Sequence, residues 1–392
     1  MRVSPRVLLV DDEPVLLRSM QRLFRATRPE WSLRTAASAA DAVLLLEEEA
    51  TDVLVTDLDL GETDGTDLLG FVMDRWPGTI RIAFTGHASG PQVIRAASVI
   101  HQVVHKAGDP ETLLDAIERA LTSRASIVDE TMRGWISGGH ELPAAPSLWP
   151  RLEEALRRPK TTSEELAALI EQDPAVTARV LQLASSAYFG ASSPPRSVAQ
   201  AANWIGVANL RGLVLSVELA RLFRNVPPAL NVDQIAFDGY RTGRLAMAIL
   251  RGHPDAARAL LGGILHDLGI LVRGMRGLEA LLADFRTADA MGLSLHTVER
   301  KTRGFTHAEV GAALLGVWGI EEALVDIVRD HHVLPPIGGQ PLDGATAVYL
   351  ANLLVAEADE GLENPRIDVD ASWLGVTAEL PAWRELAQAN AG

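Results

Sequence analysis

Five polar side chains in the first third of the chain stand where short apolar, strand-like runs end. In chain order they are Asp11, Asp12, Asp57, Thr85 and Lys106. Short apolar runs predict buried strands, and active groups gather beyond the carboxyl ends of the strands in an open parallel sheet. We therefore expect these five side chains to converge on one edge of a sheet.

The types of these side chains suit phosphoryl transfer to a carboxylate. The oxygens of three acids can hold Mg²⁺, and Asp57 is placed as a nucleophile that forms an acyl phosphate. Thr85 and Lys106 can bind the phosphoryl oxygens and offset their charge. The simpler interpretation is that all five are ordinary polar residues at strand ends, but their order on successive runs favours function.

A second group of side chains that could do chemistry is built on histidines. His266 and Asp267 stand side by side in the apolar run "GGILHDLGIL", and further along come His307 in "FTHAEVG" and His331 and His332 in "RDHHVLP". Imidazoles and carboxylates suit Zn²⁺, Fe or Mn²⁺, and a water activated by such a metal can cleave a phosphoester. The alternative is structural: the histidines cap helices and hydrogen-bond one another.

Two domains are predicted to carry these groups. Over 4–122, strand-like runs at 7–10, 31–36, 52–56, 79–84 and 101–105 alternate with helical segments at 15–26, 39–49, 66–76, 90–98 and 111–121. This alternation predicts a doubly wound, five-stranded parallel sheet of the α/β class. Residues 123–141 are expected to be a linker. Residues 142–392 are expected to be all-α, with a core over 142–357 and a C-terminal appendage over 358–392.

The first domain resembles the receiver domain of two-component response regulators. The resemblance lies in "VLLVDDEP", "DVLVTDLDLGETDG", "AFTGHAS" and "VHKAGDPETLLDAI". It implies a flavodoxin-like fold in which Asp57 accepts a phosphoryl group from a histidine kinase. Around Mg²⁺ it implies Asp11, Asp12, Asp57 and the backbone carbonyl of Asp59. Three residues depart from the family pattern: Gly61 stands where such loops usually carry proline, Val103 stands at the aromatic switch position, and Ala107 replaces the proline that follows the lysine.

The second domain resembles an HDOD domain over about residues 140–357. The segments that carry the resemblance begin with "LPAAPSLWPRLEEALRRPK" and continue through "LLGGILHDLGILV", "HAEVGAALLGVWG" and "YLANLLVAEA". HDOD domains are a helical fold related to HD phosphohydrolases, and they generally lack a complete set of metal ligands. The resemblance therefore implies a module that acts through protein contacts.

The ligands missing from the second domain agree with this resemblance. An HD site needs an earlier histidine, but the segment 238–252 has none, and His253 follows beyond the expected helix. Asn352 stands where an acid would be expected, and a neutral amide is a poor replacement for a carboxylate ligand. No "GYP" follows the paired histidines. A vestigial or structural role is favoured over catalysis, with Asp238 and His253 left open as alternative ligands.

The composition limits which partners the chain can have. A formal charge of −15 argues against general affinity for nucleic acid or an anionic membrane, and the absence of cysteine excludes disulfides and thiolate zinc sites. No apolar run approaches the roughly 20 residues that span a bilayer. We therefore expect a cytoplasmic protein.

The combined expectation is a response regulator. A histidine kinase would phosphorylate Asp57 with Mg²⁺, and this would control a non-catalytic HDOD module that contacts an unidentified protein target. Two alternatives stay open for the module: an HD-type metal-dependent phosphodiesterase or phosphohydrolase, and a sensor that binds a nucleotide without hydrolysing it. A homodimer is a further open alternative, since receivers often dimerise.

Overall fold

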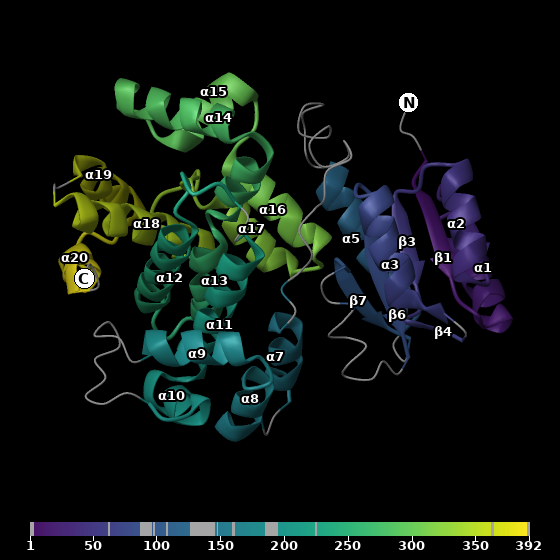
Figure 1. Ribbon diagram of the computed structural model, residues 1–392. Helices are drawn as coiled ribbons and strands as arrows, with labels where there is room; N and C mark the ends of the chain where they lie inside the picture. Colours follow the sequence, from purple (N-terminus) through teal and green to yellow (C-terminus); the bar gives the residue numbers. More distant parts are fainter. Residues whose placement is uncertain are drawn as a thin grey trace. The chain divides into compact units, whose positions relative to one another are not determined.

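The structure is a computed structural model with two compact units, an α/β unit at the N-terminus and a helical unit that comprises residues 146–312 and 321–392 (Figure 1). It describes residues 4–61, 63–86, 96, 99–106, 109–125, 146, 148–158, 161–184, 195–223, 226–361 and 364–389. The helix expected over 90–98 and the Ala107 position therefore lie outside the described residues, apart from residue 96.

Five parallel strands form the sheet of the first unit in the order β2–β1–β3–β6–β7. They are β1 (Arg6–Val10), β2 (Ser32–Ala36), β3 (Val53–Thr56), β6 (Ile80–Thr85) and β7 (Gln102–His105). In the paired register Val10 lies opposite both Ala36 and Thr56, and Thr56 lies opposite Ala83. The carboxyl ends of the strands are thus level with one another, and the predicted doubly wound sheet is confirmed.

Helices and one short hairpin surround this sheet. The described helices are α1 (Pro14–Thr27), α2 (Ala39–Glu48), α3 (Gly65–Arg75) and α5 (Glu111–Ala125), and the hairpin pairs β4 (Asp59–Leu60) with β5 (Thr63–Asp64). Strands β1 and β3 are almost wholly apolar and buried, as expected for parallel strands that helices cover on both faces. Helix α5 continues to Ala125, past the expected receiver boundary at residue 122.

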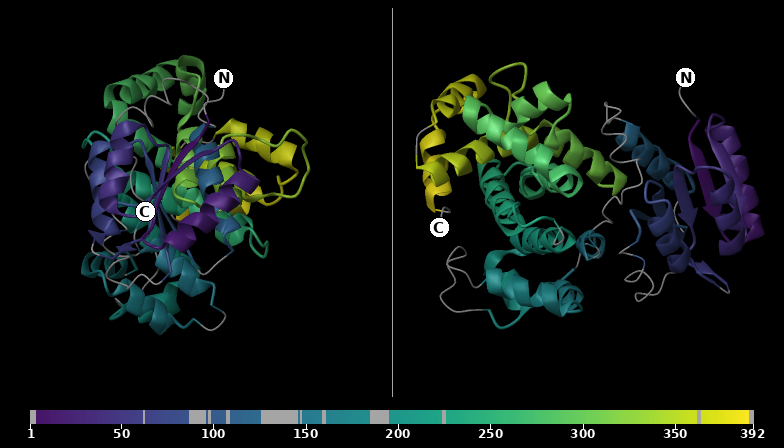
Figure 2. Two further views of the ribbon diagram at one scale, coloured as in Figure 1. Left: turned by 90° about the vertical axis from the view of Figure 1, so that its right-hand side faces the viewer. Right: turned by 45° about the horizontal axis from the view of Figure 1, so that its top comes forward.

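All regular elements among the described residues of the second unit are helices, as predicted. They are α7 (Trp149–Leu156), α8 (Ser163–Ile170), α9 (Pro174–Ala184), α10 (Val198–Ile205), α11 (Val207–Leu222), α12 (Val232–Ile249), α13 (Ala256–Leu265), α14 (Leu268–Met291), α15 (Leu295–Arg303), α16 (His307–Val317), α17 (Glu322–Asp330), α18 (Gly344–Glu360), α19 (Pro365–Leu374) and α20 (Leu380–Ala389). Figure 2 shows α14 and α15 side by side along one end of this unit.

The centre of the helical unit is a close pair of helices, α12 and α13, with α18 packed against both. Glycines allow the close approach: a Cβ at Gly263 would lie 2.3 Å from the Cα of Gly243, and a Cβ at Gly243 would lie 2.2 Å from the carbonyl oxygen of Leu260. Because α13 ends at Leu265, directly before the histidine of the "HD" pair, this tight packing fixes the position of that histidine.

The C-terminal appendage packs onto α18. Arg384 Nε on α20 lies 2.7 Å from Glu357 Oε1, and the hydroxyl of Tyr349 donates to Asp370 Oδ2 on α19 at 2.6 Å. Residues 365–389 therefore complete the helical unit instead of extending away from it. None of the helices in the described part of the chain combines the length and apolarity needed to cross a membrane.

Candidate functional site

The carboxyl edge of the parallel sheet brings together three of the predicted side chains. Lys106 Nζ lies 2.5 Å from Asp57 Oδ2 and 2.7 Å from Asp11 Oδ2. The strands position these side chains: the N–H of Asp57 donates to the carbonyl of Val10 at 3.1 Å, and the N–H of Lys106 donates to that of Thr85 at 2.9 Å. Thr85 ends β6 at the same edge and is buried.

Burial and charge set the protonation of this edge. Asp11 is fully buried, and burial raises its pKa more than the contact with Lys106 lowers it. Burial alone would lower the pKa of Lys106, but hydrogen bonds to Asp11 and Asp57 outweigh that effect and raise it. The ammonium is therefore held protonated between two acidic side chains, where it can bind the oxygens of an incoming anionic group.

The other two predicted acids lie beside this group. The N–H of Asp59 donates to Asp57 Oδ1 at 3.2 Å, which orients the second carboxylate oxygen, while the Asp59 side chain is exposed. Asp12 is also exposed, and a Cβ at Gly61 would lie 3.3 Å from its Oδ2. Among the described residues, no three acidic side chains of this edge have ligand atoms within 4.8 Å of one another.

Two further residues of the sheet region have defined surroundings. A Cβ at Gly65 would lie 1.9 Å from the carbonyl oxygen of Asp57, so only glycine fits where α3 begins. This requirement is not visible in the sequence, because a glycine at a helix start has several common explanations. Val103, at the expected switch position, lies partly buried against the core of the sheet.

The five predicted residues of the second unit lie together at the ends of their helices, and we call them the histidine cluster. Its members are His266, Asp267, His307, His331 and His332. His307 Nε2 lies 2.9 Å from His332 Nε2 and 3.4 Å from Asp267 Oδ1, while His266 Nε2 lies 3.2 Å from Asp267 Oδ2. The ring centroids of His331 and His332 are 4.0 Å apart.

Hydrogen bonds fix three rings of the histidine cluster in one orientation. The Nδ1 atoms of His266 and His331 lie 2.7 and 2.6 Å from backbone carbonyl oxygens, and that of His307 lies 2.7 Å from Glu299 Oε2. Such oxygens only accept, so each Nδ1 carries the hydrogen and a neutral ring presents its lone pair at Nε2. Nε2 of His331 is buried and has no hydrogen-bond partner among the described residues.

This donor set fits a transition-metal ion. Two groups have ligand atoms within 4.8 Å of one another: His307, His331 and His332, and His266, Asp267 and His331. Converging imidazole nitrogens with one carboxylate suit Zn²⁺ or Mn²⁺.

The electrostatics of the cluster distinguish its members. Burial, followed by the neighbouring imidazoles, lowers the pKa of His331 and of His332 well below the usual value, so both rings are neutral at pH 7. For His266, burial lowers the pKa, but the Asp267 carboxylate raises it more. Burial would raise the pKa of Asp267, yet the surrounding imidazoles hold it well below the usual range. A metal ion would therefore compete with a proton more strongly at His266 than at His331 or His332.

Three other residues were considered in the sequence as positions for metal ligands, and only one of them lies beside the histidine cluster. Asn352 on α18 lies beside His266, so it stands next to the cluster where an acid was expected. His253 instead pairs with Asp255, and Asp238 contacts Gln234 and Arg241. Neither His253 nor Asp238 belongs to a group of converging ligand atoms in the described part of the chain.

Two residues near the cluster were missed by the sequence analysis. Glu299 contacts His307, and the ring centroid of His296 lies 4.8 Å from that of His332. Both lie on α15 three residues apart, and this spacing places them on one face of a helix. Their spacing of three residues is the feature of the sequence that could have identified them.

Comparison with known proteins assigns both units. The family model of the response regulator receiver domain matches residues 7–118, and that of the HDOD domain matches residues 142–334. The chain is 34% identical over 128 residues to the transcriptional regulatory protein GlrR of Escherichia coli K12, which is 32% of this chain and 28% of that protein. It is 28% identical over 224 residues to an uncharacterized protein of Treponema pallidum, 56% of this chain and 43% of that one.

The fold of the helical unit has a counterpart among solved structures. An HDOD domain protein of unknown function from Geobacter sulfurreducens matches with a TM-score of 0.54 and 21% identity, covering 69% of this chain and 98% of that one. The chain thus contains a receiver domain followed by an HDOD domain. This combination makes it a response regulator. It spans less than half the length of the two curated relatives above.

Proposed function

We propose that Asp57 is the phosphoacceptor of this response regulator and that a histidine kinase supplies the phosphoryl group. The observation that carries this proposal is the contact of 2.5 Å between Lys106 Nζ and Asp57 Oδ2 at the carboxyl edge of the sheet. A carboxylate beside a fixed ammonium can attack phosphorus, while the ammonium takes the charge of the transferred oxygens.

The surrounding side chains have defined parts in this transfer. Asp57 Oδ2 forms the new bond to phosphorus as the bond to the donor breaks, and Lys106 and Thr85 bind the phosphoryl oxygens. The oxygens of Asp11, Asp12 and Asp57 and the carbonyl of Asp59 would hold Mg²⁺, which when bound offsets the charge of those oxygens. Lys106 bridges the carboxylates of Asp57 and Asp11. It must therefore release one of them for the phosphoryl transfer and for the binding of Mg²⁺.

We further propose that the HDOD domain is a non-catalytic output that acts through protein contacts. The amide of Asn352 beside His266 supports this, since it provides no carboxylate where the resemblance to HD enzymes requires one. A phosphoryl group adds about −1.5 to −2 charge at the receiver edge. That added charge would shift the population of receiver conformations and thereby the availability of the output domain.

Capture experiments test this output. The full chain, loaded with beryllofluoride and Mg²⁺, is immobilised and exposed to a cell extract beside an Asp57→Asn variant treated identically. We expect at least one protein to be captured by only one of the two, because only the wild type carries the phosphoryl mimic. Identical captured proteins would remove phosphorylation from the control of the output.

A second candidate function is a metal-dependent phosphoesterase in the HDOD domain. It is favoured by one observation, the convergence of imidazole Nε2 atoms in the histidine cluster. A metal ion bound there would activate a water molecule for attack on phosphorus. Stoichiometric metal in the purified chain together with hydrolysis of bis(p-nitrophenyl) phosphate or a cyclic dinucleotide would support this function, and metal without hydrolysis would reject it.

A further inference from the structure

Helix α15 places a fully buried carboxylate against the histidine cluster. One oxygen of Glu299, Oε2, accepts the backbone N–H of His307 at 2.9 Å and lies 2.7 Å from its ring Nδ1. The other oxygen, Oε1, accepts a hydrogen bond from Arg273, and both side chains have no exposure to solvent. A single carboxylate thus fixes the backbone and the ring of the residue at which α16 begins.

This contact determines which nitrogen of His307 faces the cluster. Because a carboxylate only accepts, Nδ1 donates its hydrogen to Glu299 and the Nε2 lone pair points toward Asp267 and His332. The rings of His266 and His331 are held in the same way, but by neutral backbone carbonyls. Among these three rings, only His307 therefore has a carboxylate as the acceptor at Nδ1, and such a partner strengthens an imidazole as a metal ligand.

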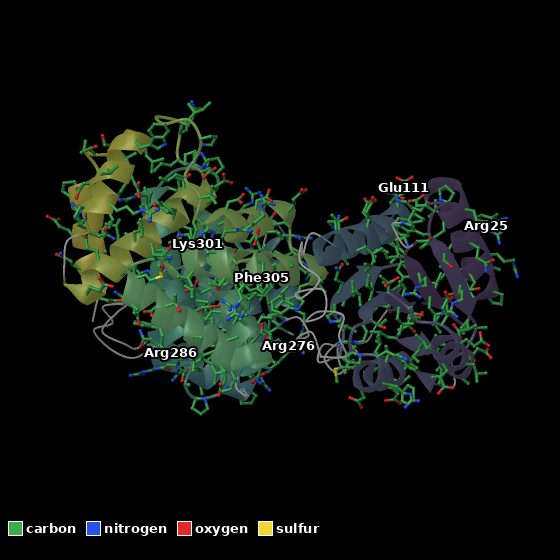
Figure 3. All side chains as sticks on the ribbon, turned by 90° about the horizontal axis from the view of Figure 1, so that it is seen from above. Arg25, Glu111, Arg276, Arg286, Lys301 and Phe305 are labelled. Carbon is green, nitrogen blue, oxygen red and sulfur yellow. The ribbon has the colours of Figure 1, made fainter. Side chains whose placement is uncertain are left out.

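A buried ionic network holds Glu299 in turn. Arg273 Nη2 lies 2.7 Å from Asp284 Oδ2, and Arg303 Nε lies 3.0 Å from the same oxygen. Phe305, labelled in Figure 3, packs near Arg273, whose Cζ lies 5.9 Å from its ring centroid. Removing one member of such a network would leave another charge buried and unpaired, so the network keeps the Glu299 carboxylate in place.

We propose that Glu299 is a positioning residue for a transition-metal site in the histidine cluster. It orients the lone pair of His307 and supplies negative charge behind that ligand, while Arg273 links it to α14. The proposal rests on the metal-binding part of the second candidate function, and it is independent of phosphoryl acceptance at Asp57.

Metal titration of the full chain tests this role. Zn²⁺ alone is added to metal-free protein in competition with a chromophoric chelator. We expect Glu299→Gln to weaken Zn²⁺ binding about 10- to 100-fold, because the amide keeps the shape and loses the charge. Glu279→Gln, an exposed position on α14, is the matched control and should bind like the wild type. Unchanged affinity in a folded Glu299→Gln variant, or no Zn²⁺ binding by the wild type, overturns the proposal.

A measurement on the wild type keeps the proposal testable if the variant fails to fold. In ¹⁵N spectra of the histidine rings, His307 should show a protonated Nδ1 before and after Zn²⁺ addition, and Zn²⁺ should shift its Nε2 resonance. A protonated Nε2 with a bare Nδ1, or an Nε2 resonance that Zn²⁺ leaves unmoved, contradicts the proposal. Either failure would leave phosphorylation of Asp57 intact, which distinguishes it from failure of the receiver function.

Discussion

Replacing Asp57 by Asn is expected to reduce phosphorylation of the full chain by acetyl phosphate and Mg²⁺ to background. The amide lacks the nucleophilic oxygen that forms the acyl phosphate, and Lys106 loses the nearest of its carboxylate partners. Intact-mass spectrometry of the two proteins, incubated side by side, measures the fraction that gains a phosphoryl group.

The matched control for this loss is Asp74→Asn. Asp74 is an exposed acid on α3 and lies outside the carboxyl edge of the sheet. The Asp74→Asn variant should be phosphorylated like the wild type, because neither the charge nor the position of Asp74 contributes to the transfer. Full phosphorylation of Asp57→Asn would show that another residue is the acceptor and would contradict the assignment of Asp57.

Replacing Gly269 by Ala is expected to destabilise the helical unit by about 3 kcal/mol, the upper part of the usual range for overpacking. An added Cβ would lie 1.8 Å from the carbonyl oxygen of His307 and 2.9 Å from the backbone nitrogen of Gly311. Because both atoms belong to the backbone of α16, no side-chain rotation relieves the clash. Helices α14 and α16 must move apart, and Asp267 then moves away from His307.

Urea unfolding of the full chain, followed by circular dichroism, measures this destabilisation. Gly70→Ala on α3 is the control, since the nearest atom to its added Cβ would be 3.9 Å away. That change should be neutral or stabilise the receiver by about 0.5–1 kcal/mol, because alanine favours a helix over glycine. A Gly269→Ala variant with the same midpoint as the wild type would contradict the close packing of α14 on α16.

Much of the receiver could be predicted because its strands are short apolar runs that end in polar residues. The runs at 7–10 and 52–56 are buried on both faces of a parallel sheet, so the sequence marks them clearly. The hairpin of β4 and β5 could not be predicted, since two-residue strands have no periodicity. The bridge of Lys106 between Asp11 and Asp57 was also missed, because proximity at an edge does not specify which atoms make contact.

The histidine cluster was predicted as a set, but the buried residues that hold it in place were not. Adjacent His266 and Asp267 stand out in an apolar run, whereas Arg273 and Glu299 look like the ordinary polar residues of amphipathic helices. Charged residues are rarely fully buried, so a sequence pattern assigns them to the surface by default. Their burial follows from the packing of α14 on α15, which lies beyond the reach of local periodicity.

Hydrogen exchange of the full chain most directly tests whether phosphorylation of the receiver controls the HDOD domain. Exchange is followed by mass spectrometry with and without beryllofluoride and Mg²⁺, in the wild type and in Asp57→Asn. We expect altered exchange in peptides from residues 146–389 of the wild type only, because the effect of the added charge at Asp57 must be transmitted to the output domain. Changes confined to residues 4–125, or equal changes in both proteins, would contradict it.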